Sequence, residues 1–371
     1  MKIALVHDSL VQYGGAEKTL KALSEAFPDA PIYTSIYNKE VFHGVFTADK
    51  IHTTELQNKP KWLKKRYKWL LPFLPSAFES LDFSGFDVVI SSSSSFAKGI
   101  VTPLDTIHIN YCHTPTRFLW DSTHSYFKDQ KLSFLVKFIA RAILHWTRVW
   151  DKAAADRVDY FIANSKNVSQ RIQKYYRRDS TIINPPVEIE NMKVKEAHAD
   201  FFLIVSRLEK YKNVEIAIKA FNQIPSRKLI IIGEGNEKAR LEKLAGKNIQ
   251  FLGHKNDQVV QDYYQNCQAF IATARDEDFG ITPVEAMGAG KPVLAIREGG
   301  FMETIIENET GIFYEEHEPK SLLEGLVKLM EKTWDPQKIR EHAEKFDTKV
   351  FQEKIKKFVE KVTNDNQTSN K

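Results

Sequence analysis

The sequence has few of the residues that mark several protein classes. Its two cysteines, Cys112 and Cys267, cannot build a disulfide framework or a cysteine-rich metal site, which favours a reducing compartment. Its 16 glycines and 14 prolines are too few for a low-complexity chain. No apolar run approaches the roughly 18 residues that a membrane-spanning helix requires. The first residues also lack the apolar segment and cleavage site of a signal peptide, so we expect a cytoplasmic protein.

What is present is the composition of a folded protein. Hydrophobic residues make up 42% and charged residues 27% of the chain, and a length of 371 residues predicts two domains. The net charge of +5 is unevenly distributed, since residues 1–184 carry +8 and residues 185–371 carry −3. The first half therefore favours an anionic partner, and a membrane surface, a nucleic acid and an anionic substrate are all open at this point.

Short apolar runs alternate with helical patterns along the whole chain, which predicts two sets of parallel strands in an α/β fold. Strands are expected at 2–6, 87–91, 107–112, 160–163, 201–206, 229–233, 249–252, 269–273 and 292–296, and helices at 16–27, 213–221 and 236–245. Two prolines after Asn184 mark a domain boundary. We therefore predict domains at 1–184 and 185–345. Residues 346–371 are predicted to form a helix returning to the first domain, with a frayed tail after Thr363.

Two carboxylates, Glu277 and Glu285, stand eight positions apart around a predicted helix start. The amino terminus of a helix presents free N–H groups and the positive end of its dipole, so the backbone of Phe279, Gly280, Ile281 and Thr282 suits a phosphate. An alternative interpretation needs no ligand. Thr282-Pro-Val-Glu285 also has the pattern of a capping box with proline at the first helical position.

Two cations, Arg207 and Lys212, follow the predicted strand 201–206, at the edge where α/β sheets bind ligands. Arginine binds two phosphate oxygens with its fork and lysine adds a point charge, so the pair fits a diphosphate. Fixed cations of this kind can stabilise a departing diphosphate without a metal ion. The alternative is a solvated helix start.

The first half offers its own candidates at strand ends. His113 follows the predicted strand 107–112, and Gly14 and Gly15 follow the strand 2–6. The two glycines would bring backbone N–H groups to a diphosphate, although most such pairs are plain turns. A histidine in such a position is often a structural hydrogen-bonding group. The serine run 91–95 fits either a polar edge or a mobile loop.

The pattern E-x-F-G-x-x-x-x-E at 277–285, continued as A-M-G-A-G-K-P, resembles the E-x7-E signature of family 4 retaining glycosyltransferases. The segments at 14–17, 207–213 and 339–359 are also similar to that family. The resemblance implies the GT-B fold, in which two Rossmann-like domains face a central cleft that holds a nucleotide-sugar. It also implies a metal-independent, retaining transfer of a hexose, with no bound cofactor.

The resemblance also implies residue roles. Glu277 would contact the donor sugar, Glu285 would hold the ribose hydroxyls, and His113 would lie against the donor sugar. The form H-T-P-x-R-x-L-W-D at 113–121 resembles a branch rich in mannosyltransferases of polysaccharide biosynthesis, which favours GDP-mannose and a glycan or lipid-linked glycan acceptor.

Three alternatives stay open. The chain would also fit a GT-B sugar-nucleotide epimerase or hydrolase, or a non-catalytic GT-B partner subunit. Asp276-Glu277-Asp278 reads as D-x-D, a metal-binding pattern of another glycosyltransferase architecture, although its place inside E-x7-E argues against that role.

The segment 59–74 is basic and aromatic, with six cations and no acid in residues 59–70. As a helix it would gather aromatic and leucine side chains on one side and lysines on the other, which suits an anionic membrane surface. The apolar and basic stretch 132–150 has a similar composition. A core-packed helix with a solvated cationic face is the alternative, and no nucleic-acid module is present. We therefore expect a peripheral protein on the inner face of the cell membrane.

Overall fold

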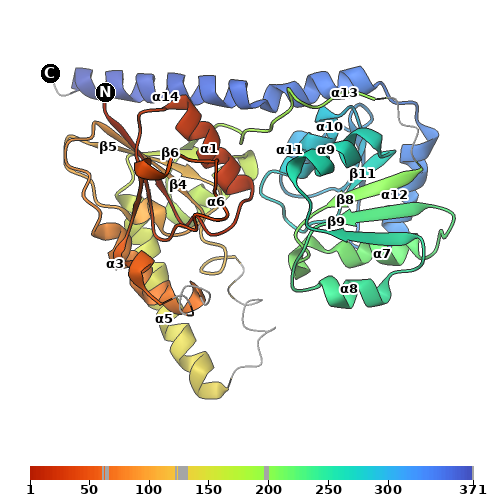
Figure 1. Cartoon of the computed structure of the whole chain (residues 1–371), viewed down its shortest axis with the longest axis horizontal. Coiled ribbons are helices and arrows are strands. Elements are labelled where there is room, and N and C mark those ends of the chain that lie inside the picture. The colour runs from red at the N-terminus through yellow and green to blue at the C-terminus, as the bar shows by residue number, and fades with distance from the viewer. Residues whose placement is uncertain (61, 63–66, 122, 124–132, 196–199, 370–371) are drawn as a thin grey trace. The chain divides into compact units, whose positions relative to one another are not determined.

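The computed structural model describes residues 1–60, 62, 67–121, 123, 133–195 and 200–369 (Figure 1). The chain forms two compact units. Unit 1 comprises Met1–Asn184 and Phe351–Lys371, and unit 2 comprises Pro185–Val350. Because unit 1 takes its last segment from the end of the chain, the polypeptide passes between the units twice.

Unit 1 is built on a seven-stranded parallel sheet with the strand order β3-β2-β1-β4-β5-β6-β7. Its strands are β1 (Ile3–His7), β2 (Ile32–Thr34), β3 (Ile51–Thr53), β4 (Val88–Ser93), β5 (Ile107–Cys112), β6 (Tyr160–Ala163) and β7 (Ser180–Ile182). Its α-helices are α1 (Gly15–Ala26), α3 (Leu74–Glu79), α5 (Phe134–Asp156), α6 (Lys166–Tyr176) and most of α14 (Thr348–Ser369). Short 3-10 helices lie at Ala48–Lys50, Glu55–Asn58, Tyr67–Phe73 and Ala97–Gly99.

Unit 2 is built on a six-stranded parallel sheet with the strand order β10-β9-β8-β11-β12-β13. Its strands are β8 (Phe201–Val205), β9 (Lys228–Ile232), β10 (Ile249–Gly253), β11 (Ala269–Ala272), β12 (Val293–Ile296) and β13 (Gly311–Tyr314). Its α-helices are α7 (Val214–Phe221), α8 (Lys238–Leu244), α9 (Asp257–Asn266), α10 (Ile281–Gly288), α11 (Phe301–Thr304), α12 (Pro319–Glu331) and α13 (Pro336–Ala343). Two 3-10 helices are Lys210–Lys212 and Glu344–Phe346.

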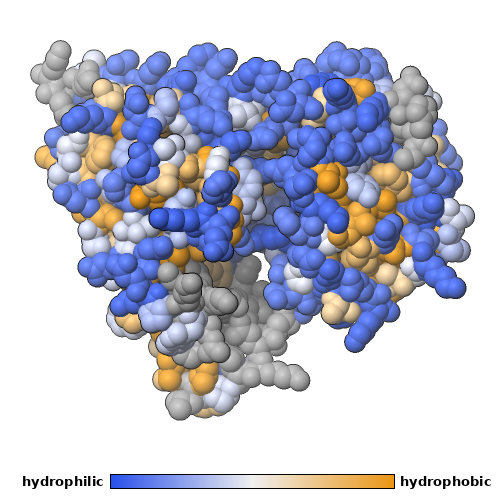
Figure 2. Space-filling model, in the orientation of Figure 1, coloured by the Kyte–Doolittle hydropathy of each residue, from blue (hydrophilic) through white to orange (hydrophobic). Residues whose placement is uncertain are grey.

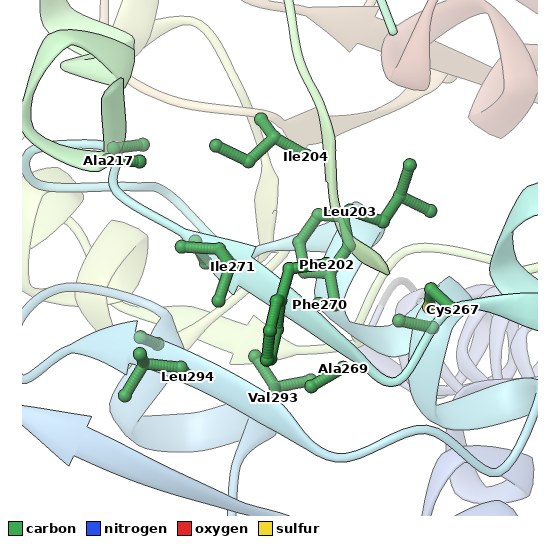
Figure 3. Packing of buried hydrophobic residues seen from close by; sticks show 14 of the residues in the cluster. Phe202, Leu203, Ile204, Ala217, Cys267, Ala269, Phe270, Ile271, Val293 and Leu294 are labelled. Carbon is green, nitrogen blue, oxygen red and sulfur yellow. The ribbon is translucent and has the colours of Figure 1, made fainter. Parts of the chain in front are cut away.

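The central strands β8, β11 and β12 of unit 2 are continuous apolar runs, as expected where helices cover both faces of a parallel sheet. In unit 1, β4 and β5 also bury polar residues such as Ser91 and His108. In unit 2, residues of neighbouring strands pack into one core, as Figure 3 shows for Phe202, Leu203 and Ile204 of β8, Phe270 and Ile271 of β11, and Val293 and Leu294 of β12. Cys267 is buried in the same core, and Cys112 is buried in unit 1. The two parallel α/β sheets confirm the fold class that the alternating pattern predicted.

The carboxyl-terminal helix α14 supplies part of the core of unit 1. Phe351, Ile355 and Val359 are each no more than 2% exposed and lie in the cluster that contains Tyr111. The helix continues to Ser369, so the frayed tail predicted after Thr363 is wrong for residues 364–369. Extending an existing helix adds one hydrogen bond for each residue fixed, which outweighs the weak helix propensity of asparagine and threonine here.

No helix in the described part of the chain is both long and apolar enough to cross a membrane.

Candidate active site

The E-x7-E carboxylates and the two cations of unit 2 lie at the carboxyl ends of β8 and β11. Lys212 ends a 3-10 turn after β8, and its Nζ lies 2.5 Å from Oε2 of Glu277, which follows β11. The Thr273 hydroxyl donates to the backbone carbonyl of Lys212 at 2.7 Å, which ties the ends of the two strands together. The structure therefore brings Lys212 and Glu277 into direct contact.

The charge of Lys212 is held by its partner. Burial acts to lower the pKa of this amine, but the charge of Glu277 and its hydrogen bond outweigh burial and raise the pKa. Lys212 therefore stays protonated at neutral pH. Arg207 is more exposed and donates from Nη2 to the Tyr211 hydroxyl at 2.8 Å, so both predicted cations stand on the same loop.

The loop between Glu277 and α10 depends on two glycines further along the chain. A Cβ atom at Gly300 would lie 2.4 Å from the Cα of Phe279, and one at Gly299 would lie 2.6 Å from the carbonyl oxygen of Glu277. The Gly300 N–H donates to that carbonyl at 2.7 Å. The Phe279 side chain is 2% exposed and packs edge-on against Phe346. Only a residue without a side chain allows this backbone approach, which gives the Gly299-Gly300 pair a structural reason.

Helix α10 begins at Ile281, with Gly280 before it in the left-handed region at φ 97°. No side chain caps this end of the helix, so the capping-box interpretation of Thr282 and Glu285 is wrong. Ile281 and Thr282 lie in the first turn of α10 and are only partly buried. The first N–H groups of an α-helix have no partner within the helix. This end of α10 therefore presents the kind of donor set that the sequence predicted.

Glu285 is held by a residue that the sequence did not single out. The buried Tyr264 hydroxyl, on α9, donates to Glu285 Oε2 at 2.9 Å. Burial, with the charge of Glu285 next, raises the pKa of Tyr264 well above its usual value, so the phenol remains a donor. Tyr264 lies near the end of α9, a helix that was not predicted from the sequence, and its position in sequence gives no signal of this contact.

In unit 1, Asp8 organises the loop that follows β4. Its carboxylate accepts hydrogen bonds from the backbone N–H groups of Ser94, Ser95, Phe96 and Ala97, at 2.7 to 3.0 Å. Four charge-assisted bonds fix the loop. The serine run 91–95 is thus an ordered strand end and loop, and not a mobile one.

His113 follows β5 and is partly buried. Its Nε2 lies 2.8 Å from the Ser92 hydroxyl on β4, and Ser92 in turn lies 3.2 Å from Nδ1 of His7 on β1. Burial lowers the pKa of His113 to about 3, with a further contribution from His7. His113 is therefore neutral at physiological pH.

The glycine loop of unit 1 caps α1. Gly14 occupies the N-cap position, and its N–H donates to Oε2 of Glu17 at 2.9 Å, while Gly15 begins the helix. The other oxygen of Glu17 lies 3.6 Å from Nε2 of His7. His113, Ser92, His7, Glu17 and Gly14 therefore form one continuous chain of contacts across β5, β4, β1 and α1.

Hydrogen bonds to Asp151 hold the segment 113–121 in place. Asp151 of α5 accepts hydrogen bonds from Thr116 at 2.8 Å and from the Trp120 indole at 2.8 Å, and pairs with Lys98 at 2.6 Å. Asp121 lies within 4 Å of two arginines, Arg117 and Arg171. These contacts indicate that Asp121 helps to order the segment.

The predicted site residues thus form two groups. Arg207, Lys212, Glu277, Phe279, Gly280, Ile281, Thr282 and Glu285 belong to unit 2, and Gly14, Gly15 and His113 belong to unit 1. Sequence reasoning named Ser92 only within the serine run 91–95, whereas it missed His7, Asp8, Lys98, Asp151 and Tyr264. The signal for His7, Asp8 and Ser92 was their position just after the carboxyl ends of predicted strands. Among the residues that the structure describes, no three His, Cys, Asp or Glu side chains are placed to hold a metal ion.

The basic segment 59–74 lies partly outside the described residues, which exclude Lys61, Leu63, Lys64, Lys65 and Arg66. Nothing is established for the side chains of Tyr67, Lys68 and Trp69. Of the remaining apolar residues, Leu70 and Leu74 are buried in the core of unit 1, whereas Trp62 and Phe73 are more than half exposed. The single apolar face predicted for this segment stays a prediction.

Solved structures share this arrangement of two parallel α/β units, which is the GT-B fold. Sucrose-phosphate synthase from Thermosynechococcus elongatus superposes with a TM-score of 0.76 at 15% identity, covering 98% of this chain and 99% of that one. The Anabaena protein HepE in complex with UDP-glucose has a TM-score of 0.72 at 19% identity, covering 97% and 100%.

Two family models divide the chain between them. The model described as Glycosyltransferase Family 4 matches residues 13–191, and the model described as Glycosyl transferases group 1 matches residues 188–346. The chain belongs to the family 4 glycosyltransferases with the GT-B fold. The family and the glycosyltransferase class predicted from the sequence are confirmed.

Among curated relatives, an uncharacterised glycosyltransferase of Methanocaldococcus jannaschii is 28% identical over 58% of this chain and 62% of its own length. The GtfA subunit of a peptide N-acetylglucosaminyltransferase from Streptococcus agalactiae is 29% identical over 44% and 35%. The match therefore spans less than two thirds of these two relatives. The alpha-1,3/1,6-mannosyltransferase ALG2 of Dictyostelium discoideum is 24% identical over 84% of this chain and 85% of its own length.

Proposed function

We propose that the protein transfers a hexose from a nucleotide-sugar to a glycan or lipid-linked glycan, with retention at the sugar and without a metal ion. The favoured donor is GDP-mannose. The observation that carries the proposal is the contact between Lys212 and Glu277 beside the first turn of α10. A fixed cation, a carboxylate and a helix amino terminus converge there at one edge of the sheet.

These groups fit the charges of the reaction. As the bond between sugar and diphosphate breaks, negative charge develops on the leaving phosphate. Lys212, Arg207 and the N–H groups of α10 would stabilise that charge, and preorganised donors of this kind contribute strongly to catalysis. Glu277 would hold the sugar, and Glu285, positioned by Tyr264, would hold the ribose. The departing phosphate would then help to accept the proton of the attacking hydroxyl.

The preference for mannose rests on the ALG2 relatives and on the resemblance of segment 113–121. Other relatives and neighbours carry UDP-sugars in their names, so the base needs a direct test. A thermal-shift panel with UDP, GDP and ADP, each with excess EDTA, provides it. A ligand at 100 times its Kd adds about 2.7 kcal/mol to the folded state.

We expect GDP to stabilise the protein despite EDTA. Stabilisation by UDP alone would overturn the choice of donor, and stabilisation that requires a metal would overturn the metal-free site. Nucleotide release with and without an acceptor extract then separates transfer from hydrolysis or epimerisation, because only transfer depends on the acceptor.

We further propose that the protein associates with an anionic membrane surface, and that α5 makes the contact. Figure 1 shows that the amino-terminal part of α5, drawn in yellow, extends away from the sheet of unit 1. Its apolar side chains are exposed, at 86% for Phe134, 65% for Phe138, 50% for Ile139 and 70% for Trp146. Figure 2 shows hydrophobic surface at this end of the helix.

The charge of α5 indicates what binds to its exposed apolar surface. Residues 133–150 contain Lys137, Arg141 and Arg148 and no aspartate or glutamate. Exposed aromatic side chains beside cations suit the headgroup region of an anionic bilayer, where each cation contributes about 1 kcal/mol. An apolar protein partner would explain the aromatic residues but not the absence of acids.

Flotation with vesicles tests this proposal. We expect binding to phosphatidylcholine vesicles that contain phosphatidylglycerol, and little binding to pure phosphatidylcholine. The double variant Phe134→Ser/Phe138→Ser should lose binding, and Lys137→Gln/Arg141→Gln should weaken it about tenfold or more at low salt. The control is Val327→Ser in unit 2, which removes an apolar side chain that is 54% exposed. Unchanged binding by both α5 variants would overturn the proposal.

A further inference from the structure

The contacts around His113 extend well beyond what a sugar-contacting histidine needs. Its Nε2 meets the Ser92 hydroxyl, and the same hydroxyl meets Nδ1 of His7. The two imidazole rings stand nearly perpendicular, with centroids 6.5 Å apart. His7 is 2% exposed, and Ser92 is fully buried. One buried hydroxyl thus connects two imidazoles.

A hydroxyl in this position can donate only one hydrogen. Ser92 therefore donates to one histidine and accepts from the other, and the direction decides which ring nitrogen of His113 carries its proton. A neutral imidazole has one N–H donor and one bare acceptor. The direction of the Ser92 hydrogen bond consequently determines whether His113 Nδ1 is a hydrogen-bond donor or an acceptor for a ligand.

Glu17 sets that direction. Its Oε1 lies 3.6 Å from His7 Nε2, and its Oε2 accepts the Gly14 N–H. In a neutral His7, the carboxylate favours the proton on the nearer ring nitrogen, so Nε2 carries hydrogen and Nδ1 is bare. Ser92 then donates to His7 and accepts from Nε2–H of His113. The proton of His113 is thereby placed on Nε2.

We propose that Glu17, His7 and Ser92 are positioning residues that hold His113 in the Nε2–H tautomer, with Nδ1 as a hydrogen-bond acceptor for a hydroxyl of the transferred sugar. Within the described part of the chain, no hydrogen bond occupies His113 Nδ1. The assignment rests on the proposed function for the identity of the ligand, but the tautomer itself is a property of unit 1 alone.

An acceptor selects its ligand differently from a donor. A bare Nδ1 binds a hydroxyl that donates and gains nothing from a fluorine or a hydrogen in that place. If Nδ1 carried a proton, fluorine would remain a partial acceptor for it. The relay also gives Glu17 a second task, because the same carboxylate caps the glycine loop before α1.

Nitrogen-15 NMR of the histidine-labelled full chain reads the tautomer directly, without donor or acceptor. Signals of His113 are assigned by comparison with His113→Gln. We expect a protonated Nε2 and a bare Nδ1 in the wild type. In Glu17→Gln the amide N–H₂ can donate to His7 Nε2, which reverses the relay and moves the His113 proton to Nδ1. A protonated Nδ1 in the wild type would overturn the proposal.

Matched controls separate the relay from general disturbance. Ser91→Ala removes the neighbouring hydroxyl, which contacts His108 at 2.7 Å, and should leave the His113 signals unchanged. Ser92→Ala should give a mixture of both His113 tautomers with an unchanged fold. An unmixed Nε2–H signal in Ser92→Ala would show that Ser92 does not direct the proton.

Transfer assays connect the tautomer to the reaction. We expect Ser92→Ala to lower kcat about tenfold while the nucleotide Kd stays unchanged, because Ser92 contacts His113 and His7 and none of the predicted nucleotide-binding groups. With the wild-type protein, a donor that carries fluorine in place of the contacted hydroxyl and a donor that carries hydrogen there should both be transferred more slowly, and by the same factor. A fluorinated donor that keeps most of its rate would contradict an acceptor role for Nδ1. If the nucleotide panel fails but the NMR result holds, the proposed function fails and the relay stands.

Discussion

Lys98 and Asp151 form an ion pair at 2.6 Å in which both side chains are at most 2% exposed. The Tyr176 hydroxyl and the Trp120 indole donate to the second oxygen of the carboxylate, at 2.9 and 2.8 Å. The pair joins the loop after β4 to α5 and to segment 113–121. Its removal from one side would leave a buried charge without compensation.

We therefore expect Lys98→Met to lower the free energy of unfolding by about 3–5 kcal/mol, as for other buried pairs that lose one partner. Urea denaturation measures the change. The control is Lys349→Met, which breaks an exposed pair with Glu190 at 2.7 Å and should have no measurable effect. Equal effects of the two substitutions would contradict a structural role for the buried pair.

Glu277→Gln keeps the shape of the side chain and removes its charge. We expect transfer to fall by about 100-fold or more, because the carboxylate is proposed to act on the donor sugar. Stabilisation by nucleotide in the thermal-shift assay should persist. Glu324→Gln, which changes an exposed glutamate on α12, is the matched control. Full transfer by Glu277→Gln would remove Glu277 from the mechanism.

Tyr264→Phe deletes the hydroxyl that donates to Glu285 and leaves the ring in place. Hydrogen bonds to charged groups contribute about 1.5–3 kcal/mol, so the nucleotide Kd should rise about tenfold or more. We expect kcat at saturation to change little, since Glu285 is proposed to hold the ribose. Tyr263→Phe alters the neighbouring tyrosine on α9 and should leave the Kd unchanged. Isothermal titration calorimetry distinguishes the two.

The pH dependence of stability should report the buried His108. Its side chain is fully buried, and burial, with the nearby charge of Arg157, lowers its pKa to about 3. The unfolded chain, with a pKa near 6.5, binds more protons, so stability falls as the pH drops below about 6.5.

Between pH 7 and pH 5 this one group should remove about 2 kcal/mol from the free energy of unfolding. His108→Gln cannot titrate, so the difference between its denaturation curves at the two pH values should be smaller by that amount. If the wild type and His108→Gln lose the same stability between pH 7 and pH 5, groups other than His108 determine the loss of stability at acid pH.

The sequence predicted β5 and β6 of unit 1 and β8 and β11 of unit 2 closely, because each carries buried apolar residues and has a clear end. It did not predict β2 or the edge strands β3 and β7, which have three residues each and are too short to show a period. The strand β13 was also missed, although its four residues are all buried. Strands of this length are defined by their neighbours and not by their own pattern.

The candidate site shows the same division. Glu277, Lys212 and Glu285 could be found because their spacing marks a known signature. Tyr264 and Asp151 could not, since each acts through a partner far away in the sequence. The alternative for Glu285, a capping box, was equally consistent with the sequence and was removed only when α10 was seen to begin at Ile281.

Because the chain passes between the units twice, the two units complete their folding in a fixed order during translation. Unit 2 occupies one uninterrupted stretch, Pro185–Val350, and is complete as soon as that stretch has left the ribosome. Unit 1 begins first but must wait for Phe351, Ile355 and Val359, which fill its core from the end of the chain. The unit whose translation begins first therefore completes its folding last. Until α14 packs onto unit 1, the apolar surface that it covers is exposed, and such surface is what chaperones bind.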